Sequence, residues 1–152
     1  MSELLTHLTK IGIAVILSGL IGYERETQHK SVGLRDTILI CLGATSITIF
    51  TLRLTNYVQS TQVSFDLIRA IAYYLVALGF VGGGIVNKYK NKVEGITTGT
   101  LLLPVAILGF YCGIECYLEA IVLGIVIYLI LKFKYFKIKF LTIKKLKNKR
   151  RK

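Results

Sequence analysis

The chain has 152 residues, of which 53% are hydrophobic and only 18% charged, with a mean hydropathy of +0.60, and this is too apolar for an ordinary soluble domain. Of its 20 Lys and Arg residues, 11 follow Leu131, and without them the formal net charge of +12 falls to +1. The basicity therefore belongs to the tail, which argues against a nucleic-acid-binding protein, because that function spreads Lys and Arg over a folded face.

Five segments are candidates to cross a membrane as helices, since a bilayer core of about 30 Å takes roughly 20 apolar residues. In chain order they are residues 4–23, 34–54, 67–86, 95–113 and 116–131. Gly113 and Glu115 predict a turn between the last two segments. We therefore expect an all-α, polytopic bundle of about five helices over residues 1–131, followed by a basic tail over residues 132–152.

The distribution of basic residues predicts the orientation of this bundle. With the N-terminus outside, 17 of the 20 Lys and Arg residues lie on the inner side, and only Lys10, Arg53 and Arg69 lie outside. This bias obeys the positive-inside rule, whereas four helices would place the tail opposite one of the basic loops. The tail is then cytoplasmic, where it either fixes topology as a solvated flank or lies on the bilayer through an apolar face.

Small residues at helical spacing predict close contacts between helices, because association in lipid depends on close backbone approach. They are Ser18 and Gly22, then Gly79, Gly82, Gly83 and Gly84, then Gly95 and Gly99, and finally Gly109 and Gly113. We expect the third and fourth helices to cross at contact distance. The alternative is a cavity or ion path to which the glycine backbone contributes carbonyl groups; Thr98, near Pro104, is a candidate to line a polar pocket.

Charged residues gather around the first inner loop, where Glu24 and Arg25 end one helix and Arg35 and Asp36 begin the next. Charges near membrane depth are costly unless they are paired or hydrated. Glu24 is expected to pair with Arg35, and Arg25 with Asp36. Such pairs either lock the hairpin or form a functional site, namely a cation or proton relay or a docking surface.

Signatures of catalysis and of metal or cofactor binding are not found in the sequence. His7 and His29 are expected on opposite sides of the membrane, so they complete neither a metal site nor a nucleophile and base pair. Three Cys residues at positions 41, 112 and 116 match no metal spacing and are expected to act as small core hydrophobes. We therefore expect a non-enzyme without a resident metal or cofactor.

Four strings together resemble the membrane domain of the MgtC/SapB family: GLIGYERE at 19–26, VGLRDTILICLGA at 32–44, ALGFVGGGIV at 77–86 and VEGITTGTLLLPVAILGFYCG at 93–113. The resemblance implies a bacterial inner-membrane protein with its N-terminus outside. It also implies a link to magnesium limitation, acid tolerance and intracellular survival. The best-studied kind of member resembles a regulator that binds the membrane part of the F-type ATP synthase.

Residues that match the family's motif are the first candidates for functional positions. They are Glu24, Arg25, Gly33, Arg35, Gly79, Gly82, Gly84, Gly95 and Thr98. This sequence departs from the family pattern at Asp36, where an uncharged polar residue is common, and in lacking the usual Trp of the fourth helix. Well-known members also carry a cytoplasmic domain where this sequence has the basic tail.

Two functions are compatible with these features. The first is a small regulatory or accessory membrane protein that acts through helix contacts with the lipid-embedded parts of a partner or of another copy of itself. The alternative is a magnesium or proton transporter that uses Glu24, Arg35 and Asp36.

Overall fold

The computed structural model describes residues 2–58, 67–89 and 92–132. In chain order the labelled elements are α1 (Ser2–Thr27), α2 (Leu34–Val58), α3 (Leu67–Ile85), β1 (Asn87–Tyr89), β2 (Lys92–Glu94) and α4 (Ile96–Gly113). A fifth helix covers residues 117–132, where the described part of the chain ends. The expected tail, apart from residue 132, and most of the expected outer loop thus lie outside the described residues.

Four of these helices are long and apolar enough to cross a membrane, by length and composition. The apolar stretches run over Glu3–Thr27, Leu34–Thr55, Ile68–Ile85 and Ile96–Gly113. The structure thus confirms a helical, multi-pass design. The fifth helix occupies the expected segment, but its described part is shorter than these four.

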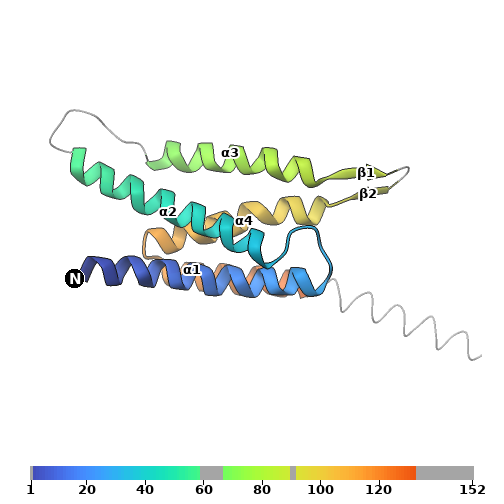
Figure 1. Cartoon of the computed structure of the whole chain (residues 1–152), viewed down its shortest axis with the longest axis horizontal. Coiled ribbons are helices and arrows are strands. Elements are labelled where there is room, and N and C mark those ends of the chain that lie inside the picture. Colours follow the sequence, from blue (N-terminus) through green and yellow to red (C-terminus); the bar gives the residue numbers. More distant parts are fainter. Residues whose placement is uncertain (1, 59–66, 90–91, 133–152) are drawn as a thin grey trace, which may run out of the picture.

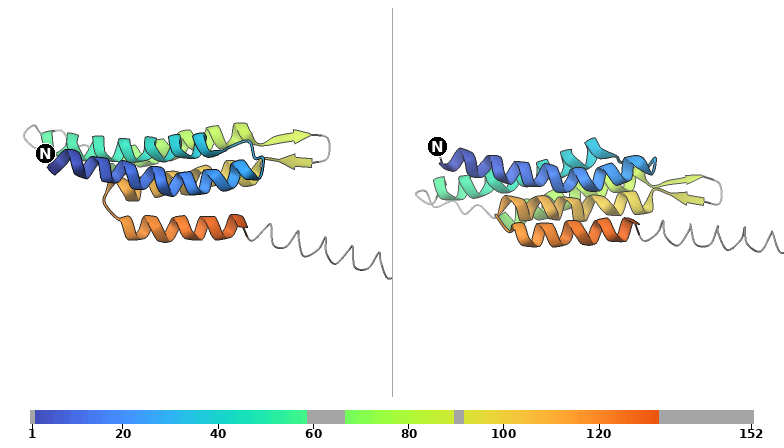
Figure 2. Two further views of the ribbon diagram at one scale, coloured as in Figure 1. Left: turned by 60° about the horizontal axis from the view of Figure 1, so that its bottom comes forward. Right: turned by 90° about the horizontal axis from the view of Figure 1, so that it is seen from below.

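A short antiparallel hairpin between α3 and α4 corrects the expectation that this segment is only a loop. Asn87 pairs with Glu94, and Lys88 with Val93. Backbone hydrogen bonding in this ladder satisfies polar groups between two apolar helices. Figures 1 and 2 show the hairpin extending beyond the ends of the helices.

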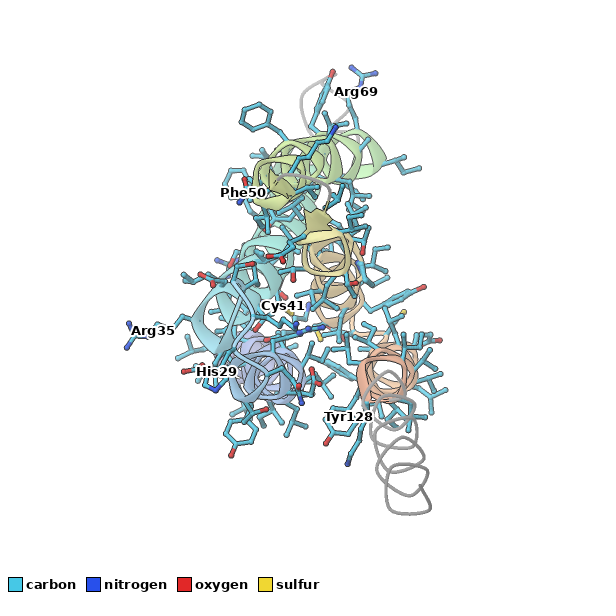
Figure 3. The ribbon with its side chains drawn as sticks, turned by 90° about the vertical axis from the view of Figure 1, so that its right-hand side faces the viewer. His29, Arg35, Cys41, Phe50, Arg69 and Tyr128 are labelled. Atoms are coloured by element: carbon cyan, nitrogen blue, oxygen red, sulfur yellow. The ribbon has the colours of Figure 1, made fainter. Side chains whose placement is uncertain are left out.

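Successive helices run in opposite directions, so the segments that connect them lie alternately at the two ends of the bundle (Figures 1 and 2). The loop from α1 to α2, the β1–β2 hairpin and residue 132 lie at one end, which we call the hairpin end. The N-terminus and the turn from α4 to the fifth helix lie at the other, which we call the N-terminal end. The α3 helix and the fifth helix lie at opposite edges of the bundle (Figure 3).

The core forms where α4 packs between its neighbours, and most of α4 is buried. One apolar cluster joins α1, α2, α4 and the fifth helix, and it includes Ile21, Cys41 and Leu108. A second joins α2, α3 and α4 around Phe110, whose ring meets Tyr74 edge-on at 5.6 Å. Figure 3 shows Cys41 in the middle of the bundle, as expected for a small core residue.

Buried threonines form a stripe along α2 that the sequence analysis did not single out. They are Thr37, Thr45, Thr48 and Thr51. Each hydroxyl lies within hydrogen-bond distance of the carbonyl four residues earlier, which satisfies it without a partner helix. The Thr45 hydroxyl also lies 2.9 Å from the Gly109 carbonyl, which gives α2 and α4 a polar contact.

Candidate functional site

The end of α1 holds two charged side chains of opposite sign, of which Arg25 is buried and Glu24 is mostly shielded. Arg25 lies on the same helical face as the buried Ser18 and Ile21, and its side chain is only 6% exposed. Glu24 is 11% exposed, and its Oε2 lies 3.6 Å from Arg25 Nε, too far for a strong hydrogen bond. Neither of these two atoms has a hydrogen-bond partner among the described residues. The pair is thus an electrostatic contact within the hairpin end.

The start of α2 uses its acidic neighbours as helix caps, not as partners for arginine. The Gly33 N–H donates to Asp36 Oδ2 at 3.1 Å, and the Leu34 N–H donates to Glu26 Oε2 at 3.2 Å. Both carboxylates satisfy N–H groups that a helix N-terminus leaves without intrahelical partners, and they oppose the positive end of its dipole.

The structure therefore does not bring the four predicted charges into one site. Glu24 faces Arg25 instead of Arg35, and Asp36 caps α2 instead of pairing with Arg25. Arg35 is exposed and points away from the bundle in Figure 3. The reason is local: a cap three residues along the chain forms without ordering a long arginine side chain across the hairpin.

Several predicted glycines lie where two helix backbones meet. A Cβ on Gly82 would lie 2.9 Å from the Gly99 carbonyl oxygen, so α3 and α4 cross here as expected. Gly22 packs against Leu34 and Thr37 of α2. Gly109 and Gly113 of α4 likewise contact α2, at Cys41, Ala44 and Thr48. These positions require the absence of a side chain.

Gly95 has a different requirement. It precedes α4 with φ of 89°, in the left-handed region that glycine occupies readily, and a Cβ there would overlap the Ile85 carbonyl oxygen. Gly33 is less constrained, since a Cβ would make only ordinary contact with Glu26. Thr98, the third residue of α4, is buried. Gly95 therefore fixes how α4 leaves the hairpin.

Three other glycines of α3 face outward. None of the described residues lies within 4 Å of a Cβ built on Gly79, Gly83 or Gly84. Val76 and Phe80 share this side of the helix at spacings of three and four residues, and Phe80 is 85% exposed. We call these five residues the outer face of α3. The α3 helix lies at an edge of the bundle (Figure 3), and its contact with α4 is made by Gly82.

An ion pair at the N-terminal end was missed by the sequence analysis. Lys10 of α1, with a side chain only 8% exposed, lies 2.9 Å from Glu115 in the turn after α4. Glu115 has a positive φ of 66°. The partners are 105 positions apart in the sequence, so local pattern analysis does not find this pair. A single Lys on the buried face of an apolar helix was nevertheless a signal.

Comparison with known proteins gives the family of this bundle. Residues 11–138 match the MgtC family. This range includes all four matching strings and most of the residues of the five helices. The chain belongs to the MgtC family.

Relatives of this MgtC-family chain include three from different bacteria. Protein SapB of Bacillus subtilis (strain 168) is 31% identical over 115 residues, which cover 74% of this chain and 50% of SapB. Protein MgtC of Brucella abortus (strain 2308) is 33% identical over 100 residues, covering 66% and 39%. Protein MgtC of Salmonella typhimurium (strain 14028s / SGSC 2262) is 31% identical over 115 residues, covering 75% and 46%.

The chain thus spans half or less of the length of these MgtC-family relatives. No solved structure matches it. Within the part that matches, the Gly-x-Glu-Arg end of α1 supplies both a helix contact at Gly22 and the buried Glu24 and Arg25. The family resemblance noted in the sequence therefore falls on residues that hold the helices together as well as on the charge pair.

Proposed function

We propose that this MgtC-family chain is a regulatory or accessory protein of the bacterial plasma membrane that binds another membrane helix on the outer face of α3. In this proposal it has no catalytic activity, and its N-terminus lies outside and its basic tail inside, as the positive-inside rule predicts. Its biological setting is magnesium limitation, acid stress or intracellular survival, as the resemblance implies.

The open glycines of α3 are the observation that carries this proposal. Elsewhere in the chain, at Gly22, Gly82, Gly99, Gly109 and Gly113, a glycine admits the backbone or side chain of a neighbouring helix. Gly79 and Gly83 have the same four-residue spacing that favours close helix contact in membranes, but they have no neighbour within 4 Å of a Cβ among the residues that the structure describes. A helix from another protein molecule would pack against these glycines in the way that α4 packs against Gly82.

The proposed partner is a second copy of the chain or the membrane part of another complex. By resemblance, the membrane part of the F-type ATP synthase is the first candidate for the latter. Cation transport through Glu24, Arg35 and Asp36 is the weaker proposal, because Arg35 and Asp36 are exposed at the start of α2 and lie apart from the buried pair.

Gly83→Leu is expected to abolish co-purification of the partner while leaving membrane insertion intact. A Cβ at this position has nothing within 4 Å in the described part of the chain, so the leucine is expected to block a helix that approaches from outside. Co-purification from membranes in mild detergent, with quantitative mass spectrometry, measures the loss.

Gly12→Leu is the matched control, because Gly12 of α1 also has nothing within 4 Å of a Cβ. It should retain the partner. Equal recovery of companions with Gly83→Leu and with the unmodified chain would refute binding at this face.

A further inference from the structure

A groove of about 480 Å³ lies between α4 and the fifth helix. The fifth helix is at the edge of the bundle opposite to α3 (Figure 3). Apolar and aromatic side chains form most of its lining, together with one carboxylate. From α4 come Ile107 and Tyr111, and from the fifth helix come Leu118, Glu119, Val122 and Val126. Its volume lies within the range typical of sites for small molecules.

The depth of this groove in the membrane follows from the helices that form it. The 18 residues of α4 span about 27 Å, close to the thickness of the hydrocarbon core. The turn after α4, which holds Glu115, therefore lies at the membrane boundary of the N-terminal end. Glu119 is only four residues further, at the level of the lipid headgroups, and Val126 lies about 10 Å deeper.

Glu119 is the group whose chemistry selects an occupant. It is exposed on the side of the seam that faces lipid, and it forms no hydrogen bond or ion pair with the residues that the structure describes. Glu115 of the same end already pairs with Lys10. A carboxylate at a lipid-facing position is stabilised when it meets a cationic group, and most strongly by one that can donate hydrogen bonds.

We infer that this groove binds a phospholipid with a primary-amine headgroup. The ammonium group donates to the Glu119 carboxylate, and one acyl chain lies along Val122 and Val126 toward Ile107. Phosphatidylethanolamine has this chemistry. Phosphatidylcholine carries the same charge but no N–H donor, and phosphatidylglycerol carries no cation. This site is separate from the proposed partner face on α3, so each can fail without the other.

The absence of Trp from the whole sequence allows a direct test with an introduced fluorophore. The variant Val126→Trp places a single Trp at the deep end of the groove. It is reconstituted into vesicles that contain phosphatidylethanolamine, phosphatidylcholine or phosphatidylglycerol brominated in the middle of the acyl chain, at equal mole fraction in an unbrominated background. Quenching then reports which lipid occupies the groove.

Brominated phosphatidylethanolamine is expected to show about a threefold higher apparent affinity than brominated phosphatidylcholine, a difference appropriate to one charge-assisted contact at a membrane surface. In Val126→Trp combined with Glu119→Gln, this preference should disappear. Ile16→Trp, at a position of α1 that is 63% exposed and lies outside both the groove and the outer face of α3, is the matched control and should show no preference.

Equal quenching by all three lipids at Val126→Trp would overturn the inference, since it would mean unselective boundary lipid. Quenching by none of them, with the Trp shielded, would overturn it too, because a protein helix would then fill the groove. A preference for phosphatidylethanolamine that survives Glu119→Gln would contradict the assigned role of the carboxylate.

Discussion

Gly109→Leu should destabilise the bundle by about 3 kcal/mol or more, the larger of the two stability effects expected here. Even a Cβ at this position overlaps the Cys41 carbonyl oxygen and the Ala44 methyl group of α2. A leucine adds three further carbons at a contact between two backbones that cannot yield without separating α2 from α4. Separating the two helices would also break the polar contact between the Thr45 hydroxyl and the Gly109 carbonyl, which are 2.9 Å apart. Thermal unfolding in detergent micelles, followed by circular dichroism, measures the change.

Gly79→Leu is the matched control for this prediction. It makes the same chemical change in another membrane helix, at a glycine with nothing within 4 Å. Its unfolding temperature should stay within a few degrees of that of the unmodified chain. If both variants lost stability equally, the helix contact at Gly109 would not be the cause.

Glu115→Gln is expected to destabilise the protein by about 2 kcal/mol, and clearly more than Lys10→Met does. The two partners of this ion pair differ in exposure, with side chains 8% exposed for Lys10 and 53% for Glu115. Removing the carboxylate charge leaves a buried ammonium group without a counter-charge. Lys10→Met leaves a carboxylate that water reaches, and the methionine still fills the space of the lysine. The loss of stability in Lys10→Met should therefore stay within about 1 kcal/mol.

The double variant Lys10→Met with Glu115→Gln separates this account from a general loss of packing. It should recover stability to the level of Lys10→Met alone, because no buried charge remains. Chemical denaturation of all four proteins in mixed micelles gives the coupling free energy. Simple addition of the two single effects would mean that the ion pair contributes nothing.

The helices were predictable because long apolar runs separated by charged or glycine-rich segments have few alternatives in a membrane. All five expected segments are helical in the described part of the chain, with boundaries shifted by a few residues. The β1–β2 hairpin was not predicted. Its strands, Asn87–Tyr89 and Lys92–Glu94, are too short for the alternating pattern that marks a strand.

Contacts of the charged residues were less predictable, because helix spacing gives the face of a residue but not its partner. The carboxylate of Asp36 was available both to Arg25 and to the Gly33 N–H, and the local cap formed. Arg25 itself lies on the buried face of α1, at helical spacing from Ser18 and Ile21, so its burial was open to prediction. The Lys10 contact depends on where the turn after α4 lies, which only the three-dimensional packing determines.

The same holds for the glycines: the sequence predicts that a helix has a close contact, but not which of its glycines makes that contact. The GFVGGG segment indicated a close contact for α3, and Gly82 makes it with Gly99. The sequence alone could not separate Gly82 from Gly79 and Gly83, since a helix turns by about 100° per residue and the position of α4 was unknown. In the structure Gly82 meets α4, whereas Gly79 and Gly83 lie on the outer face of α3.

Photo-crosslinking in intact membranes tests the central claim, that the outer face of α3 binds a membrane helix. A benzophenone amino acid replaces Phe80, which is 85% exposed on this face, and Ile16 of α1, which is 63% exposed, serves for comparison. The account predicts that position 80 links to another polypeptide, either a second copy or a different membrane protein, while position 16 links chiefly to lipid. Lipid adducts alone at both positions would contradict it.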